Sequence, residues 1–284
     1  ERCLFIGNQA GSNGGGAYVG LNGGAYLDGN TPPVIRDSIF LGNNAGVDGG
    51  ALHVAPTYTN LLDGTAYVDN CTITQNVAPD NGGVAVSTTH LESWSGGVLV
   101  RNSIVSGNTG APALYDFDNG RPRAQPIYFN SCSDTLQATD VFTNTADQPR
   151  FRDQLGPDAT PGSGDEDLRL IPGSPCIDRG ENTFVSSTLD FAGLPRIVDD
   201  PLTPDPIGTP PRVDMGAHEY APDDFAGLGI AFWADDSSLP TSVLASANWF
   251  EGILPEPGVP GFFNDYESGI QYPELNGSAV TGAL

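Results

Sequence analysis

Lysine is absent from this chain of 284 residues, and histidine is scarce, with three copies. All eleven basic residues are arginines, against 35 acidic residues, so the net charge is −24. A chain this acidic repels phosphate groups, which argues against nucleic acid and anionic membranes as partners. The carboxylates fit either a solvated acidic surface or calcium sites, and no other cofactor is expected.

Long apolar runs are also missing, and none approaches the roughly 18 residues of a membrane-spanning helix. With 37 glycines and 24 prolines, long helices are not expected. The four cysteines include no C-x-x-C pair and have no suitably spaced histidine, which argues against a zinc site. They indicate instead an extracellular or cell-surface protein with one or two disulfides.

A short motif that ends in asparagine recurs along the first part of the chain. Its four copies are Cys3–Asn8, Ser38–Asn43, Cys71–Asn76 and Ser103–Asn108. A Gly-Gly pair and a small residue follow most copies. Self-similarity at a nearly fixed period is typical of one structural unit stacked on copies of itself.

Each period contains short β-prone runs and no helical periodicity. In the second period these runs are Ser38–Leu41, Ala51–Val54 and Thr65–Val68. Without helical connections a doubly wound sheet is excluded, so the pattern predicts an all-β, right-handed parallel β-helix with three strands per coil.

The repeated asparagines have a structural interpretation. If Asn8, Asn43, Asn76 and Asn108 fall at one inward corner, their amides can hydrogen-bond from coil to coil in a ladder. The alternative is a row of ligand-binding amides.

Two sets of motifs carry a family resemblance. Phe5–Asn8 and Phe40–Asn43 resemble the Phe-x-x-Asn repeats of polymorphic outer-membrane proteins, although Ile73 and Val105 replace phenylalanine in later copies. The segments DLRLIPGSPCIDRG (167–180), LDFAGLPR (189–196) and VDMGAHEY (213–220) are similar to the ending of secreted bacterial choice-of-anchor Q domain proteins. His218 stands where that family usually has an aromatic residue. The resemblance covers nearly all of residues 1–221 and implies a β-helix at the cell surface or outside the cell, with no known reaction.

We predict three regions from these patterns: β-helix coils in 1–133, a terminal coil and cap in 134–221, and an acidic, aromatic-rich extension in 222–284. The cap is expected to cover an open β-helix end, which would otherwise expose strand edges. Its aspartates at 178, 190 and 214 are expected to accept backbone N–H bonds, with calcium ligation as the alternative. The extension is expected to pack on the β-helix or on another molecule, because its nine aromatic side chains are costly to expose.

The cysteines give two predictions. Cys132, in the last coil, and Cys176, in the cap, are expected to form a disulfide that staples the two parts together. Cys3 and Cys71 occupy the same repeat position two coils apart, about 9–10 Å, and are expected to be unbonded. Asn70 and Asn276 lie in N-x-[ST] sequons and are candidate glycosylation sites.

Evidence for catalysis is weak. A lyase of the pectate type needs a basic residue beside calcium-binding acids, and no such cluster is present. Asp116 and Asp118 beside Arg121 and Arg123 can line a groove, but chance explains such neighbours among 35 acidic residues. Candidates for stacking on sugars, with core or loop packing as the alternative role, are Tyr18, Tyr26, His90 and Trp94.

These observations favour a non-enzymatic structural or adhesive protein of a surface, matrix or fibre. The alternative is a β-helix that binds or degrades polysaccharide as a lyase or hydrolase. The chain opens inside a repeat, so its first coil is expected to be uncapped and to accept the tail or capped end of another copy. That contact would produce a head-to-tail homopolymer; the alternative is a tail folded back on its own chain.

Overall fold

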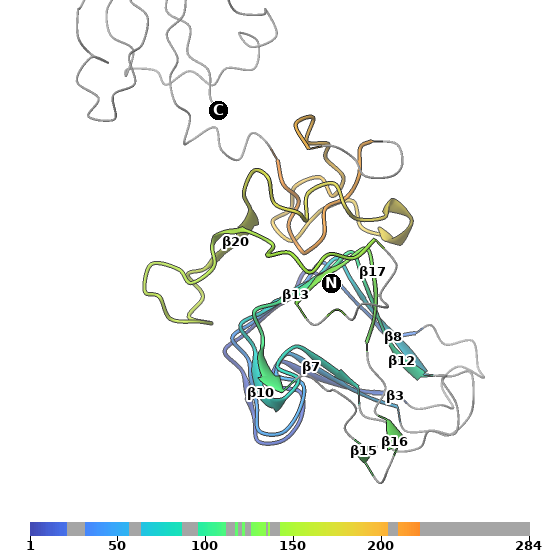
Figure 1. The fold of residues 1–284 in the computed structure, drawn as a ribbon, viewed down its shortest axis with the longest axis vertical. Helices are drawn as coiled ribbons and strands as arrows, with labels where there is room; N and C mark the ends of the chain where they lie inside the picture. The colour runs from blue at the N-terminus through green and yellow to red at the C-terminus, as the bar shows by residue number, and fades with distance from the viewer. Residues whose placement is uncertain are drawn as a thin grey trace, which may run out of the picture. The chain divides into compact units, whose positions relative to one another are not determined.

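The computed structural model describes residues 1–21, 32–56, 64–86, 96–111, 117–118, 121–122, 126–134, 136, 143–203 and 210–221. These residues wind into the predicted all-β, right-handed parallel β-helix (Figure 1). Among them the only helical element is a short 3-10 turn, η1 (Asn182–Phe184). No helix in this part of the chain is long and apolar enough to cross a membrane.

Four parallel sheets form the sides of the β-helix, and successive strands of each sheet come from successive coils. Sheet I contains β1 (Leu4–Ile6), β5 (Ile39–Leu41), β9 (Thr72–Thr74), β13 (Ile104–Ser106) and β18 (Cys132–Ser133). Sheet II contains β2 (Gln9–Ala10), β6 (Asn44–Ala45), β10 (Val77–Asp80) and β14 (Thr109–Ala111). Sheet III contains β3 (Ala17–Leu21), β7 (Leu52–Pro56) and β11 (Val84–Val86). Sheet IV contains β4 (Val34–Arg36), β8 (Gly64–Asp69), β12 (Gly96–Arg101) and β17 (Ile127–Phe129).

Strand register shows that one sequence repeat makes one coil. In sheet I, Ile39 pairs with Leu4 of the previous coil and with Thr72 of the next one. The predicted three strands per coil were wrong, because each full coil has four. The missed strand is the run of two to four residues after the asparagine corner, such as Asn44–Ala45, which is too short for a sequence pattern to mark.

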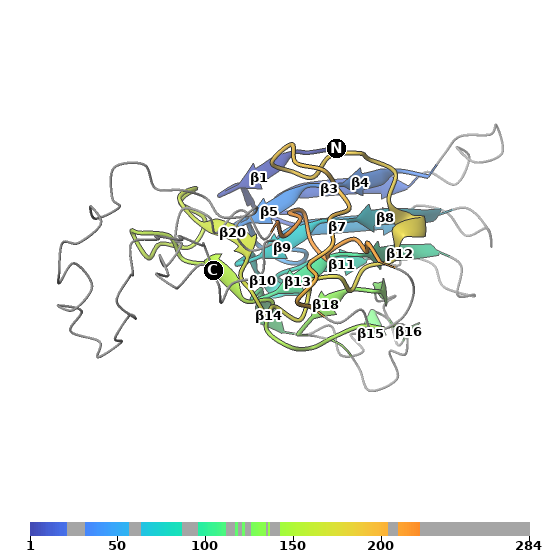
Figure 2. The ribbon, with the colours of Figure 1, turned by 90° about the horizontal axis from the view of Figure 1, so that it is seen from above.

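Apolar side chains stack in columns inside the coils. Phe40, Ile73 and Val105, from three consecutive coils, belong to one buried core that valines of the other sheets complete. Phe5 stacks on Phe40 with ring centroids 4.4 Å apart. Figure 2 shows the coils layered side by side, which explains how strands of two to six residues can form a continuous core.

Left-handed backbone corners lead into the strands of sheet I. Asp37, Asn70, Asn102 and Asn130 all have φ between 46° and 52°. Asparagine and aspartate tolerate this region better than other residues with a Cβ. The repeat therefore places one such residue where the chain turns from sheet IV into sheet I.

The described residues after the last coil, 143–203 and 210–221, are named the flank segment here. They include the antiparallel pair β19 (Phe151–Asp153) and β20 (Asp167–Leu170). A second antiparallel pair, β15 (Phe117–Asp118) and β16 (Arg121–Pro122), lies before the last coil. Residues 1–220 form one compact unit, and 222–284 lie outside the described residues.

Residues 143–145 add a rung beyond β18 at the end of the β-helix, where the sequence predicted a cap. The later residues of the flank segment lie along sheet I (Figure 2). Their contacts reach several coils: Ala217 N donates to Thr72 Oγ1 at 2.9 Å, and Gly216 N donates to the carbonyl of Asn102 at 2.8 Å. The physical reason is that sheet I carries apolar side chains on both faces. Ile39, Leu41 and Ile104 point away from the core and are still at most 4% exposed.

Candidate functional site: a buried arginine–carboxylate cluster

The repeated asparagines hydrogen-bond from coil to coil. Asn8 donates through its side chain to Asn43 Oδ1 at 2.9 Å, Asn43 to Asn76 at 2.8 Å, and Asn76 to Asn108 at 2.8 Å. The backbone N–H of each of the first three also donates to the next Oδ1. Asn43 and Asn76 are fully buried, so these amides satisfy polar groups of the turn, and their position leaves no access for a ligand.

A second ladder was missed by the sequence analysis. The backbone N–H of Cys3 donates to Ser38 Oγ, that of Cys71 to Ser103 Oγ, and that of Ser103 to Ser131 Oγ. Ser131 N then donates to Asn144 Oδ1 at 3.0 Å, so Asn144 adds a final rung beyond the last coil. The sequence signal for this second ladder is the alternation of Cys and Ser at the first position of the repeated motif.

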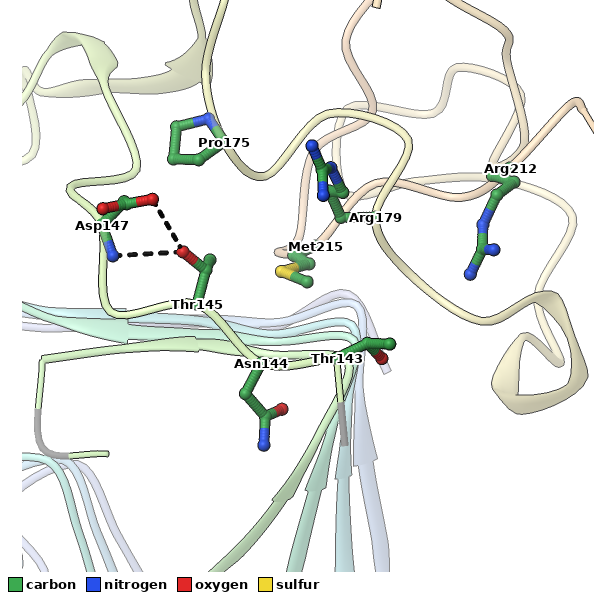
Figure 3. A pocket seen from close by; sticks show the side chains of 8 residues that line it. All are labelled: Thr143, Asn144, Thr145, Asp147, Pro175, Arg179, Arg212 and Met215. Atoms are coloured by element: carbon green, nitrogen blue, oxygen red, sulfur yellow. Dashed lines mark hydrogen bonds between the residues drawn. The ribbon is translucent and has the colours of Figure 1, made fainter. Parts of the chain in front are cut away.

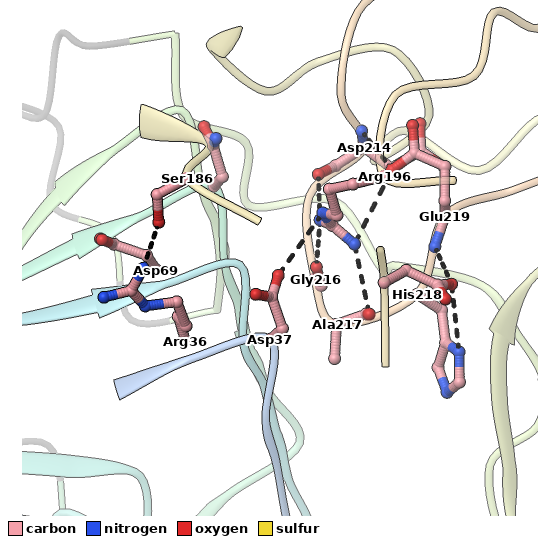
Figure 4. Close-up of polar contacts among 12 residues, drawn as sticks. Arg36, Asp37, Asp69, Ser186, Arg196, Asp214, Gly216, Ala217, His218 and Glu219 are labelled. Atoms are coloured by element: carbon pink, nitrogen blue, oxygen red, sulfur yellow. Dashed lines mark hydrogen bonds and ion pairs between the residues drawn. The ribbon is translucent and has the colours of Figure 1, made fainter. Parts of the chain in front are cut away.

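The most concentrated group of charges lies in the flank segment. Arg196 is 1% exposed, although it carries a charge. Its Nη2 donates to the carbonyls of Asp214 at 3.1 Å and Gly216 at 2.6 Å, and its Nη1 donates to Ala217 at 3.2 Å. Figure 4 shows these contacts converging on one guanidinium.

Carboxylates from separate segments surround Arg196. Arg196 Nε lies 3.7 Å from Asp37 Oδ1, and Arg196 Nη1 lies 3.7 Å from Glu219 Oε2. Asp37 belongs to a corner of the β-helix, while Glu219 belongs to the flank segment, so the guanidinium joins the two. Ion pairs with this degree of burial depend on additional hydrogen bonds to offset desolvation, and the three carbonyls supply them.

The aspartates predicted to turn the chain accept backbone N–H bonds. Asp214 Oδ1 accepts from Asp178 N at 2.7 Å, and Asp214 Oδ2 accepts from Tyr220 N at 2.6 Å. Asp178 Oδ2 accepts from Asp200 N at 3.1 Å, and Asp190 Oδ1 accepts from Leu194 N at 2.8 Å. Among the described residues, no group of three or more His, Cys, Asp or Glu side chains is arranged to hold a metal ion.

Burial changes the protonation of this cluster. Burial raises the pKa of Asp214 to about 8, and it outweighs the two N–H donors that favour the anion. Burial, followed by the neighbouring Asp214 charge, also raises the pKa of Glu219. Burial acts to raise the pKa of Asp190 too, but hydrogen bonds from His218 and two backbone N–H groups bring it below the usual value.

A pH prediction follows from Asp214. The pKa of an aspartate in the unfolded chain is near 3.8, so the folded protein holds an extra proton between about pH 4 and about pH 8. Each pH unit between 5 and 8 costs about 1.4 kcal/mol, so stability is expected to fall by roughly 4 kcal/mol as pH rises from about 5 to about 9. Urea unfolding at both pH values measures the slope. Asp214→Asn should be less stable overall but show a shallower slope; an unchanged slope would contradict the assignment.

All four cysteines are free thiols in the structure. Cys3 and Cys71 are unbonded, as predicted from their separation by two coils. Cys132 and Cys176 are both fully buried. Burial, followed by the neighbouring Cys132 thiol, raises the pKa of Cys176. The disulfide between these two cysteines stays a prediction.

Other predicted site residues are dispersed. Asn70 is 2% exposed at a left-handed corner, so the folded chain does not present it for a bulky glycan, whereas Asn276 lies outside the described residues. Tyr18 is 57% exposed and stacks on the buried ring of His53 at 5.3 Å. The other predicted sugar-stacking residues and the side chains of the proposed carboxylate–arginine groove, at 116, 118, 121 and 123, lie outside what the structure describes.

A cavity of about 230 Å³ lies within the flank segment, between residues 143–147 and its later residues (Figure 3). It is lined by Thr143, Asn144, Thr145, Asp147, Pro175, Arg179, Arg212 and Met215. Thr145 Oγ1 donates to the Asp147 carboxylate at 3.1 Å and accepts from its N–H at 3.2 Å. Pockets for small-molecule ligands usually exceed about 300 Å³, so this one is small for a whole sugar chain.

Comparison with known proteins found no match: no protein-family model, curated protein or solved structure matches the chain.

Proposed function

We propose that this chain is a non-enzymatic structural or adhesive protein of an extracellular surface, matrix or fibre, and that its β-helix ends stack head to tail. The observation that carries the proposal is the constant parallel register of the stack, in which each coil pairs with the next one through the same positions. Within the described residues, β1, β2, β3 and β4 are the terminal strands of their sheets and lie on the same side of the stack. An edge of this kind is a template for strand addition.

Apolar side chains accompany this edge. Leu4 on β1 is 51% exposed, and Val34 on β4 is 37% exposed, whereas their equivalents in the next coil, Ile39 and Tyr67, pair with strands on both sides. At the other end of the stack, β17 is the terminal strand of sheet IV and Ile127 is 49% exposed, whereas residues 143–145 add a rung beyond β18 of sheet I. Stacking of one copy on another through sheet IV would continue the same parallel register.

The asparagine and serine hydrogen-bond ladders support a mechanical, structural role. The first four coils are tied in sequence by side-chain amides at one corner. Serine hydroxyls tie several neighbouring coils at another corner, in addition to the strand hydrogen bonds. The charged residues of the flank segment are likewise used to fix it against sheet I. This distribution of polar groups fits a stiff structural element that attaches to other molecules through its ends.

Light scattering across a concentration series tests the assembly. The full chain is expected to form oligomers that grow with concentration, and the double variant Leu4→Lys/Val34→Lys should remain monomeric because charges block the edge. Ile127→Lys should also block growth if stacking is head to tail, but should not if first coils pair with each other. Leu202→Lys, at a position 89% exposed in the flank segment, is the matched control. A monomeric wild-type chain at all concentrations would contradict the proposal.

A truncation separates the roles of the two chain regions. If residues 222–284 join subunits, deleting them should lower the oligomeric state; if the strand edges do, the truncated chain should assemble as before.

Carbohydrate binding or cleavage is the second candidate, and Tyr18 favours binding. Its exposed ring is already held flat against His53, and a preorganised ring is suited to stacking on a sugar. A glycan-binding screen that compares wild type with Tyr18→Ala distinguishes this candidate from a purely structural role.

A further inference from the structure

Two arginines of the flank segment, Arg179 and Arg212, line the cavity of Figure 3. In the part of the chain that the structure describes, neither guanidinium takes part in an ion pair, whereas Arg101, Arg169 and Arg196 each have a carboxylate partner. Carboxylates are abundant in this chain, with 35 acidic against eleven basic residues. Two arginines that line one cavity without a carboxylate partner therefore need an explanation.

Arg212 is the more deeply buried of the two, with 7% of its surface exposed. Its Nε donates to the carbonyl of Gly180 at 3.0 Å, and its Nη2 donates to the same oxygen. Arg196 is also buried, but two carboxylates lie 3.7 Å from its guanidinium. A buried charge is costly without a counterion. The comparison indicates that the counterion of Arg212 is supplied by a ligand.

Arg179 has an unused donor. Its Nε is buried and has no hydrogen-bond partner within the described residues. Its backbone is held in place, because its carbonyl accepts from Asn130 Nδ2 at 3.5 Å. Figure 3 shows Arg179 and Arg212 on the same wall of the cavity, opposite Thr143. Because a guanidinium matches the geometry of a carboxylate, this wall is suited to bind the carboxylate group of a ligand.

The other end of the cavity is acidic. Figure 3 shows Asp147 at the end away from Arg212. The carboxylate of Asp147 accepts from Thr145 Oγ1 at 3.1 Å, and an ionised carboxylate can accept further hydrogen bonds but cannot donate any. Asp147 would therefore repel a second anionic group and favour the hydroxyl groups of a ligand.

Size limits the ligand further. The cavity has a volume of about 230 Å³, and a protein cavity of about 150 Å³ already holds a benzene molecule. One six-membered ring with its substituents therefore fits, whereas a chain of several rings does not. Pro175 and Met215 supply apolar surface for a carbon skeleton. Thr143 and Asp147 are exposed, so the cavity opens to solvent.

We propose that this cavity binds a small hydroxylated carboxylate, about the size of a single acidic sugar. Arg179 and Arg212 hold the carboxylate group, and Asp147 accepts hydrogen bonds from hydroxyl groups at the other end. The site goes beyond the proposed structural role and does not depend on head-to-tail stacking, because the cavity lies outside the strand edges on which stacking rests.

Isothermal titration calorimetry of the full chain tests the site. Sodium glucuronate is the probe, glucose has the same ring without the carboxylate, and sulfate is an anion without the ring. Glucuronate is expected to bind once per chain with a Kd of about 1 mM or less, and glucose at least about tenfold more weakly. No saturable binding of glucuronate, equal binding of glucose, or tighter binding of sulfate would overturn the proposal.

The methyl glycoside of glucuronate tells which source of the ligand the site accepts. Its anomeric carbon is blocked, as it is in a glycan. Binding as tight as that of glucuronate would assign the site to the end of a glycan chain, and loss of binding would assign it to a free acid.

Variants test the role of the arginines. Arg179→Gln should weaken glucuronate binding roughly tenfold or more, because it removes a charged donor from the carboxylate. Arg169→Gln is the matched control, since Arg169 lies in the same segment with a side chain 37% exposed and paired with Asp167. Arg179→Gln is a cleaner variant than Arg212→Gln, which also removes the hydrogen bonds to Gly180. Equal weakening in Arg179→Gln and Arg169→Gln would contradict a specific site.

Protection from chemical modification gives a readout on the wild-type chain, so it does not depend on the folding of any variant. Phenylglyoxal reacts with accessible guanidinium groups, and peptide mass spectrometry gives the rate at each arginine. Glucuronate, but not glucose, should slow the modification of Arg179 severalfold and leave Arg169 unchanged. Modification of Arg179 at the same rate with and without glucuronate would overturn the proposal.

Discussion

Replacing Arg196 with methionine is expected to lower the free energy of unfolding by about 3–5 kcal/mol. The substitution removes the donors to three backbone carbonyls and leaves Asp37 and Glu219 without the guanidinium 3.7 Å away. Methionine fills a similar length but satisfies none of these buried acceptors, which makes the loss larger than that of an ordinary core change. Urea unfolding of the full chain measures it.

A surface pair in the same segment is the control. Arg169 donates to Asp167 through Nε and Nη2, but its side chain is 37% exposed, so Arg169→Met should cost less than about 1 kcal/mol. Limited proteolysis adds a structural readout, because Arg196→Met should release the flank segment for cleavage before the β-helix is cut. An Arg196→Met protein within about 1 kcal/mol of wild type would show that the cluster is not what fixes the flank segment.

The asparagine ladder gives the second large effect. Asn76→Ala is expected to destabilise the protein by about 3 kcal/mol or more, because several buried partners lose their hydrogen bonds at once. Asn76 Oδ1 accepts from the backbone and side chain of Asn43, at 2.9 Å and 2.8 Å. Its Nδ2 donates to Asn108 Oδ1 at 2.8 Å and to the carbonyl of Phe40 at 3.0 Å.

Asn8 provides a matched comparison within the same ladder. It is exposed in the first coil and donates to Asn43 without a rung before it among the described residues, so Asn8→Ala should cost only about 1 kcal/mol. Chemical denaturation of both variants gives the ratio. Equal losses would indicate that the ladder contributes through local turn geometry and not through coupling between coils.

The stacked architecture was determined by sequence. A motif that recurs at nearly constant spacing must place equivalent residues at equivalent positions, and each repeat can bury its apolar side chains only against its neighbours. Phe40, Ile73 and Val105 therefore fall in one core, and the asparagines that follow them reach one corner. The period also determined that Cys3 and Cys71 lie two coils apart and remain unbonded.

Tertiary structure decided what the repeat does not encode. Arg196 is separated by 159 positions from Asp37, yet they meet because the later residues of the flank segment lie along sheet I. A periodic pattern describes contacts between neighbouring coils, and no local signal tells which face a non-repeating segment will cover. The physical reason is that the apolar outer residues of sheet I, such as Ile39 and Ile104, must be covered from water. Only the folded chain shows that the arginine and carboxylates of the flank segment hold the covering layer in place.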